Sequence, residues 1–237
     1  MIGVDSDFMN RVAEIDAYLI FLEKIDAESI LLMRRDQGMP VDGMPIQNGK
    51  FVNAYSATEQ SDLTRTLKAS AFLLLYNLME STVSNAVEAI FDEFESRGVS
   101  FDNCRLAVRK VVLGNLRQHD LAKILPELKS ISIDMITKTF RKEKIVSGNV
   151  DARRIREVAE EYGFAHPSSD GGSLLTVKTS RNDLAHGSKS FSEVGRDYTV
   201  SQIISMKEKI ILYLKEMLAN VTSYINQQHY LAGPGRL

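Results

Sequence analysis

Hydrophobic residues recur along the start of this chain at the spacing of an amphipathic helix. Phe8, Val12, Ile15, Leu19 and Leu22 are separated by four, three, four and three positions, which predicts a helix over residues 5–35. The segment QGMPVDGMPIQNGK (37–50) follows, with two Met-Pro pairs and three glycines. Such a composition is typical of a turn-rich loop, so we expect the helix to end there.

A second hydrophobic pattern continues for about 40 residues. SATE (56–59) has the Ser-x-x-Glu form of a capping box, which predicts that a helix begins after Ser56, and Gly98 is expected to close it. A straight helix of that length spans about 60 Å, so we expect it to bend, break or protrude into a partner. Its apolar positions include Leu63, Leu67, Ala71, Leu74, Leu78, Val83, Val87, Ile90 and Phe94.

The rest of the chain predicts further helices joined by short loops. They cover residues 103–118, 120–129, 132–143, 152–163, 173–186 and about 199–228. Asp151 is expected to cap the helix that starts at 152, and TVSQ (199–202) offers a capping box for the last one. Since sustained alternation and fixed repeats are absent from the sequence, the predicted fold class is all-α, a helical bundle with long antiparallel helices and additional short helices. We expect a single domain over residues 1–237, with its core at about 8–230 and a flexible tail at 231–237.

Composition narrows the classes of protein that fit. The chain has 237 residues, of which 44% are hydrophobic, and one cysteine, Cys104, so a reducing compartment and a buried, inert thiol are expected. The longest apolar run, AFLLLYNLM (71–79), is too short to span a bilayer. The first ten residues do not have the pattern of a signal peptide, and neither end carries a lipidation motif. We therefore expect a cytoplasmic protein without a membrane partner.

Charge is distributed unevenly between the two parts of the chain. Residues 1–96 carry 16 acidic and 7 basic side chains, whereas residues 97–237 carry 15 and 22. Either the two parts pack together or the basic part meets a polyanion. The densest basic region lies at 138–156, and a solvated helix face or a contact with a phosphate backbone would both account for it. Its basic residues are Lys138, Arg141, Lys142, Lys144, Arg153, Arg154 and Arg156.

The histidines do not have the spacing of a metal site. His119, His166 and His229 stand beside turn signals or near the tail, and we expect them to be surface residues. The sequence also lacks a phosphate-binding loop and a dinucleotide fingerprint. We therefore expect neither a metal nor a cofactor.

The segment RNDLAHG (181–187) gathers a permanent cation, an amide and an imidazole just before a glycine. The segment is either a polar helix end or a site that cleaves a phosphodiester. Asn182 and His186 are four residues apart and share a helix face, whereas Arg181 lies about 140° from His186. One copy therefore makes an incomplete pocket, and two copies across a two-fold axis would bring two arginines and two histidines to one cleft.

With its surroundings, this segment resembles the HEPN (higher eukaryote and prokaryote nucleotide-binding) domain superfamily. RNDLAHG matches the Arg-(polar)-x-x-x-His motif of HEPN ribonucleases, and the continuation RNDLAHGSKSFSEVGRDYT (181–199), the segment SGNVDARRIREVAEEYG (147–163) and the helix containing FLLLYNLMES (72–81) also fit. The resemblance covers roughly residues 8–230 and is closest to stand-alone prokaryotic HEPN nuclease-like proteins. It departs at Ser188, where HEPN toxins that are silenced by a nucleotidyltransferase often carry Tyr.

This resemblance implies an all-α HEPN-type helical bundle, a homodimer, and a metal-independent endoribonuclease that acts as a toxin or phage-defence effector. Its catalytic residues carry over onto Arg181, Asn182 and His186, and Glu80 or Asn77 matches the polar residue that supports the arginine. RNA is the implied partner, with a possible antitoxin or defence-system partner. The cations expected to contact RNA are Lys178, Lys189, Arg153 and Arg154.

The residue types suit metal-independent cleavage. RNA supplies its own nucleophile, the 2′-hydroxyl. An imidazole can take up and release a proton near neutral pH, and a guanidinium offers planar donors to the phosphate oxygens where charge builds up. Asn182 can orient His186 or the phosphate. Two other readings stay open: a non-catalytic HEPN module that binds a nucleotide, RNA or a protein, and a structural helical dimer in which Arg181 pairs with Glu80.

Overall fold

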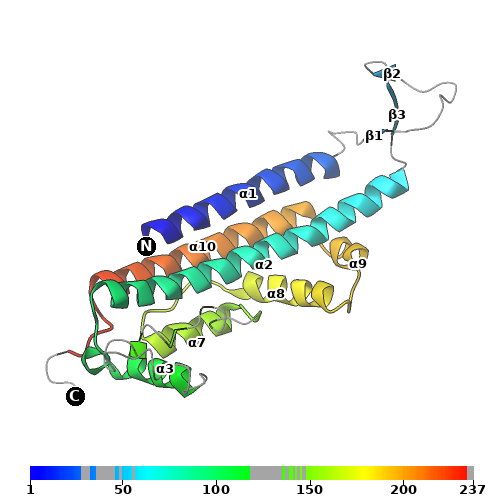
Figure 1. The fold of residues 1–237 in the computed structure, drawn as a ribbon. Helices are drawn as coiled ribbons and strands as arrows, with labels where there is room; N and C mark the ends of the chain where they lie inside the picture. The colour runs from blue at the N-terminus through cyan, green and yellow to red at the C-terminus, as the bar shows by residue number, and fades with distance from the viewer. Residues whose placement is uncertain are drawn as a thin grey trace.

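Three long helices form one layer of the protein. The computed structural model describes residues 1–27, 33–35, 46–47, 50–54, 57–117, 135–136, 139–140, 142, 145 and 148–233. Helix α1 (Ile2–Asp26) packs against α2 (Ala57–Ser96) and α10 (Val200–Asn226), and α2 also packs against α10. Figure 1 shows α1 running opposite to α2 and α10. The predicted all-α class is confirmed.

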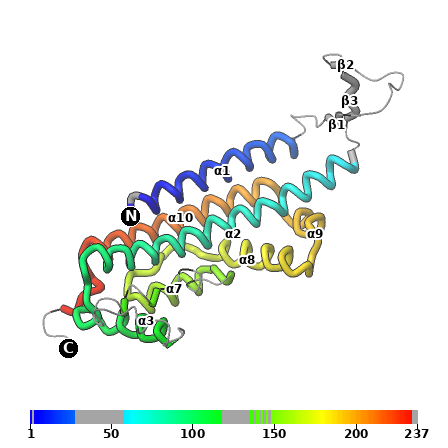
Figure 2. The backbone as a smooth tube through the Cα atoms, in the orientation of Figure 1, coloured from blue at the N-terminus to red at the C-terminus, as the bar shows by residue number. Residues whose placement is uncertain are grey.

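Each long helix forms because its apolar residues fall on one buried stripe. On α1 the predicted positions are all buried, from Phe8 to Leu22. Helix α10 begins at the predicted capping box, in which the Thr199 hydroxyl accepts from the Gln202 N–H and the Gln202 side chain accepts from the Thr199 N–H. Helix α2 has the predicted length of about 40 residues and does not break, and its first turns extend past the start of α10 (Figure 2). Ser56 itself lies outside the described residues.

The shorter helices form a second layer against α2 and α10. Helix α8 (Gly172–Ala185) packs on both of these helices, α7 (Ala152–Tyr162) packs on α8, and α3 (Leu106–Arg117) packs on α7. A 3₁₀ turn, Phe101–Asn103, precedes α3. Helix α8 therefore lies between α2 and α7 (Figure 1).

One short helix was not predicted. Helix α9 (Phe191–Arg196) begins with a capping box formed by Ser190 and Glu193 and packs closely on α2. The contact requires glycine at position 195, because a Cβ atom there would lie 1.9 Å from the carbonyl oxygen of Arg65. The pattern of six residues was too short to show a helical period.

The prediction of a helix over residues 5–35 was wrong at its end. Helix α1 ends at Asp26, and Met33–Arg35 forms strand β1. Strand β1 pairs antiparallel with β3 (Lys50–Ala54), which also pairs with β2 (Ile46–Gln47). Strand β2 and the first residue of β3 fall within the segment that we predicted to be a loop. Strand pairing joins residues far apart in sequence, which local periodicity does not report.

The acidic and basic parts of the chain pack together. The Lys207 ammonium on α10 lies 2.7 Å from a carboxylate oxygen of Asp16 on α1, and the Lys142 ammonium lies 2.6 Å from Glu88 on α2. Both pairs join a cation of residues 97–237 to an acid of residues 1–96. The first of the two explanations for the uneven charge therefore has direct support.

The start of the expected tail is hydrogen bonded to the domain. The Ala232 N–H donates to the Asn103 carbonyl at 2.9 Å, and Leu231 forms an antiparallel bridge with Cys104. Residues 234–237 lie outside the described residues, as do the helix predicted at 120–129 and most of the helix predicted at 132–143. Helix α3 confirms the helix predicted at 103–118, with a later start.

Candidate active site

The candidate site is built on the end of helix α8. His186 is the C-cap residue of this helix, and Gly187 follows with a φ of 69°. The Gly187 N–H donates to the Leu184 carbonyl at 3.3 Å, and the Ser188 N–H donates to the Asp183 carbonyl at 2.9 Å. These two bonds form a Schellman motif, which favours glycine because a side chain rarely adopts a positive φ. The helix therefore ends at His186 and leaves its imidazole exposed.

Arg181, five residues earlier, points toward α2. Its guanidinium centre lies 4.1 Å from the centroid of the Tyr76 ring, and its Nη1 donates to Asn182 Oδ1 at 2.9 Å and to the Gly148 carbonyl at 3.4 Å. The side chain is half-buried. Arg181 and His186 thus leave α8 in different directions, as the helical spacing predicts. The Asn182 side chain accepts from Arg181, so its described contact is with the arginine and not with the histidine.

A short loop before α7 completes the surroundings of Arg181. The Gly148 N–H donates to Glu80 Oε1 at 3.1 Å, and the Val150 N–H donates to the Tyr76 hydroxyl at 3.1 Å. Tyr76 and Glu80 lie one turn apart on α2 and therefore face the same way. Helix α2 thus fixes the loop whose Gly148 carbonyl accepts from Arg181.

The two supporting residues suggested by the sequence differ in what they contact. Glu80 is half-buried and reaches Arg181 through Gly148, whereas Asn77 is exposed. Within the described part of the chain, Arg181 makes no ion pair, so the hypothesised salt bridge to Glu80 is not formed within one chain. The gap between the two side chains is occupied by the backbone of Gly148.

The tyrosine beneath Arg181 is a neutral phenol. Burial raises the pKa of Tyr76, the Val150 N–H lowers it, Glu80 raises it and Arg181 lowers it, and the net direction is upward. A neutral aromatic ring presents a negative face to a cation, which favours the observed stacking. Sequence reasoning missed Tyr76 and Gly148. The position of Tyr76, one turn before Glu80, could have identified it as a site residue. For Gly148 the sequence offers only the composition of a loop.

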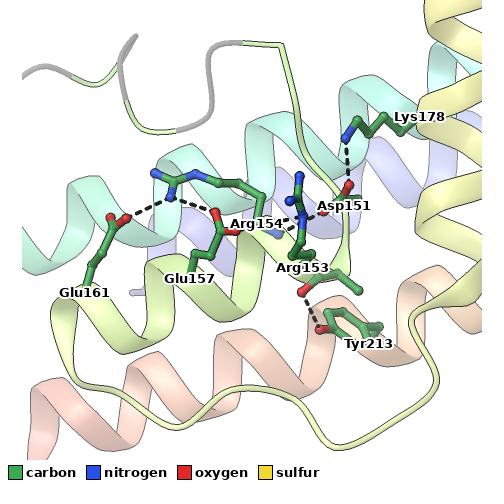
Figure 3. A network of polar contacts seen from close by, with 8 residues as sticks. Asp151, Arg153, Arg154, Glu157, Glu161, Lys178 and Tyr213 are labelled. Atoms are coloured by element: carbon green, nitrogen blue, oxygen red, sulfur yellow. Dashed lines mark hydrogen bonds and ion pairs between the residues drawn. The ribbon is translucent and has the colours of Figure 1, made fainter.

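Lys178, expected to contact RNA, takes part in an internal ion pair. Its ammonium lies 2.7 Å from Asp151 Oδ2, and the two side chains are 15% and 6% exposed. Asp151 also caps α7 as predicted, because its Oδ1 accepts from the Arg154 N–H at 2.8 Å. This pair joins α8 to the start of α7 one turn before Arg181 (Figure 3).

The other cations expected to contact RNA differ in their ion pairs and in their exposure to solvent. Arg154 donates to Glu157, Glu161 and the Ile145 carbonyl (Figure 3). Lys189 is half-exposed and lies within 4 Å of Asp183 and Asp197. Arg153 is 77% exposed, and its contact with Glu157 is long at 3.9 Å. Contact of these residues with RNA stays a prediction, and Arg153 is the most accessible of them.

The remaining candidate groups do not join the site. Cys104 is buried and free, and burial raises the pKa of its thiol to about 11, which fits the expected inert cysteine. His166 and His229 are exposed, and His119 lies outside the described residues. Among the residues that the structure describes, we find no group of three or more His, Cys, Asp or Glu residues that could hold a metal ion. Over the same residues, none of the helices is both long and apolar enough to cross a membrane.

An all-α fold in which helix α8 ends with Arg181 and His186 is the arrangement expected of a HEPN domain. The chain matches the family described as MAE_28990-like HEPN over residues 4–230, and it belongs to that family. No curated protein and no solved structure matches the chain. At the level of the family, HEPN membership indicates a nuclease or another RNA-related function.

Proposed function

We propose that this protein is a metal-independent endoribonuclease in which Arg181 and His186 carry out cleavage through attack of the RNA 2′-hydroxyl. The observation that carries the proposal is the contrast between the two side chains. The Arg181 guanidinium is held by a ring, an amide and a carbonyl, while the His186 imidazole is exposed at the end of the same helix. A held cation suits charge stabilisation, and an accessible imidazole suits proton transfer.

The reaction needs no group beyond these side chains and the RNA. The 2′-oxygen attacks the adjacent phosphorus while the bond from phosphorus to the 5′-oxygen breaks. The His186 imidazole takes the 2′ proton, and a His186 imidazolium, of the same chain or of a second copy, donates a proton to the leaving 5′-oxygen. Arg181 donates to the non-bridging oxygens, where negative charge increases in the transition state. The products are a 2′,3′-cyclic phosphate and a 5′-hydroxyl.

Metal independence is the first test of this proposal. Purified protein in EDTA is expected to cleave single-stranded RNA and to leave 5′-hydroxyl ends, which a polynucleotide kinase labels without prior phosphatase treatment. A DNA of the same sequence is the matched control, since it lacks the 2′-hydroxyl and should stay intact. Activity that is lost in EDTA and returns with a divalent ion would contradict the mechanism.

A homodimer is the second expectation. Arg181 and His186 of one chain point in different directions, so a second copy would supply the facing pair of side chains and close the cleft. Sedimentation at micromolar concentration is expected to give about twice the mass of one chain. A strict monomer that still cleaves RNA would show that one motif is sufficient.

The biological role that fits such an enzyme is that of a cytoplasmic toxin or phage-defence effector, with an antitoxin or a defence-system protein as a possible partner. RNA binding without cleavage, in EDTA and with divalent ions, would instead support a non-catalytic HEPN module.

A further inference from the structure

Tyr76 is fully buried, yet its ring contacts the cation of the candidate site. We propose that Tyr76 is a positioning residue for Arg181, which holds the guanidinium in the orientation that RNA cleavage requires. This inference rests on the proposed endoribonuclease function. Neither the motif in the sequence nor the membership of the family assigns a role to Tyr76.

The first observation is the stacking geometry. The ring is 0% exposed and comes from the middle of α2, a helix packed on both sides, so its position is fixed. The guanidinium centre lies 4.1 Å above the ring centroid, which is within the distance of a cation–π contact. A planar cation on an aromatic face loses most of its freedom to tilt. The ring therefore limits where the Arg181 guanidinium can lie.

The second observation is that the same tyrosine also fixes an acceptor for Arg181. The Tyr76 hydroxyl accepts from the Val150 N–H, and this bond holds the loop whose Gly148 carbonyl accepts from Arg181 Nη1. Asn182 Oδ1 accepts from the same Nη1. The ring holds the guanidinium from one side, and the two oxygens hold its Nη1. Its other edge can then face a phosphate.

This arrangement predicts a loss of turnover without a matching loss of RNA affinity. Without the ring, the Arg181 charge stays near the site, but its donors no longer have one orientation. Misplacement of a catalytic group by about 1 Å can lower the rate about 100-fold. We expect Tyr76→Leu to lower kcat by about 10- to 100-fold while KM changes by less than about 3-fold. Tyr76→Phe keeps the ring but loses the hydroxyl that accepts from the Val150 N–H, so it should lower kcat less than Tyr76→Leu does.

A spectroscopic measurement reports the contact independently of RNA. In the full-length protein with ¹⁵N-labelled arginine, the side-chain protons of Arg181 lie over the Tyr76 ring and are expected to resonate upfield of ordinary arginine protons. Assignment uses the signal that disappears in Arg181→Lys. The upfield shift should persist in Tyr76→Phe and be lost in Tyr76→Leu.

Tyr224 offers a matched control for loss of a buried tyrosine. It is 1% exposed, its hydroxyl donates to the Tyr162 carbonyl at 2.8 Å, and its ring packs on Phe164 and Tyr230. Tyr224→Leu should destabilise the fold about as much as Tyr76→Leu. It should leave the kcat per folded molecule and the upfield Arg181 signal unchanged.

Each outcome supports or overturns the inference. An ordinary Arg181 shift in the unsubstituted protein would overturn it, and this result does not require Tyr76→Leu to fold. Equal losses of kcat in Tyr76→Leu and Tyr224→Leu would overturn it as well, because the effect would then be structural. An upfield shift in a protein that never cleaves RNA would refute the proposed function, and with it the catalytic purpose of the contact, while leaving the contact itself intact.

Discussion

His186→Ala is expected to abolish RNA cleavage while leaving the fold and RNA binding nearly unchanged. A residue that transfers a proton in the rate-limiting step contributes about two to four orders of magnitude to the rate. The imidazole is exposed at the C-cap of α8, and the Schellman bonds that end the helix come from backbone atoms, so its removal should not disturb the helix end. Single-turnover cleavage, thermal unfolding and RNA binding measured on the same preparation check the three parts of this prediction.

His229 is the matched control for this substitution. It is also exposed, but it lies beyond the end of α10, and His229→Ala should leave cleavage unchanged. If His186→Ala instead unfolded the protein and left the activity per folded molecule unchanged, His186 would be a structural residue. The polar helix end would then be the better interpretation of the motif.

Two substitutions of Arg181 distinguish the effect of its charge from the effect of its planar shape. Arg181→Ala should abolish cleavage and also weaken RNA binding, because it removes a phosphate contact together with transition-state stabilisation. Arg181→Lys should restore binding better than turnover. An ammonium keeps the charge but has no planar fork to rest on Tyr76 or to meet two phosphate oxygens.

Asp151→Ala is expected to lower the free energy of unfolding by about 3–5 kcal/mol. The substitution leaves the Lys178 ammonium, only 15% exposed, without its partner, and breaking a buried pair from one side has a cost of that order. It also removes the side-chain cap of α7, a loss of about 1 kcal/mol that is included in this range. Urea unfolding monitored by circular dichroism measures the change.

Two variants show which part of the loss comes from the ion pair. Asp151→Asn keeps an oxygen that can cap α7 but removes the charge, so its effect reports the pairing with Lys178. Asp197→Ala removes an exposed carboxylate that pairs with Lys189, and it should leave the unfolding midpoint nearly unchanged. Equal effects of Asp151→Ala and Asp197→Ala would contradict the view that the Lys178 pair joins α8 to α7.

The same ion pair predicts how the stability difference between the unsubstituted protein and Asp151→Asn depends on pH. Burial alone would raise the pKa of Asp151, but the hydrogen bonds from Lys178 and from the Arg154 N–H lower it, and the net direction is downward. A carboxyl group with a lowered pKa stabilises the fold fully above its unfolded pKa of about 3.9, and this contribution is lost as the pH falls through the folded value. The stability difference between the unsubstituted protein and Asp151→Asn should therefore be constant near neutral pH and shrink below about pH 4.

The sequence by itself determined the long helices and the end of the motif helix. Apolar residues three and four positions apart predicted α1, α2 and α10, and local polar groups predicted the caps at Asp151 and Thr199. Gly187 marked the end of α8, with His186 as the last residue before it. These features depend on residues within about one helical turn of each other, and a sequence displays such relationships directly.

Only the tertiary structure decided what each polar side chain contacts. Lys178 has the composition of a residue that binds RNA, but Asp151 lies within its reach, so it stabilises the packing of α8 on α7. Tyr76 looked like one more apolar position of α2, yet it lies beneath Arg181. Strands β1 and β3 likewise pair although they are separated in the sequence. Such contacts join residues 17 to 105 positions apart. Their geometry is set by the packing of whole helices and strands, which no local pattern records.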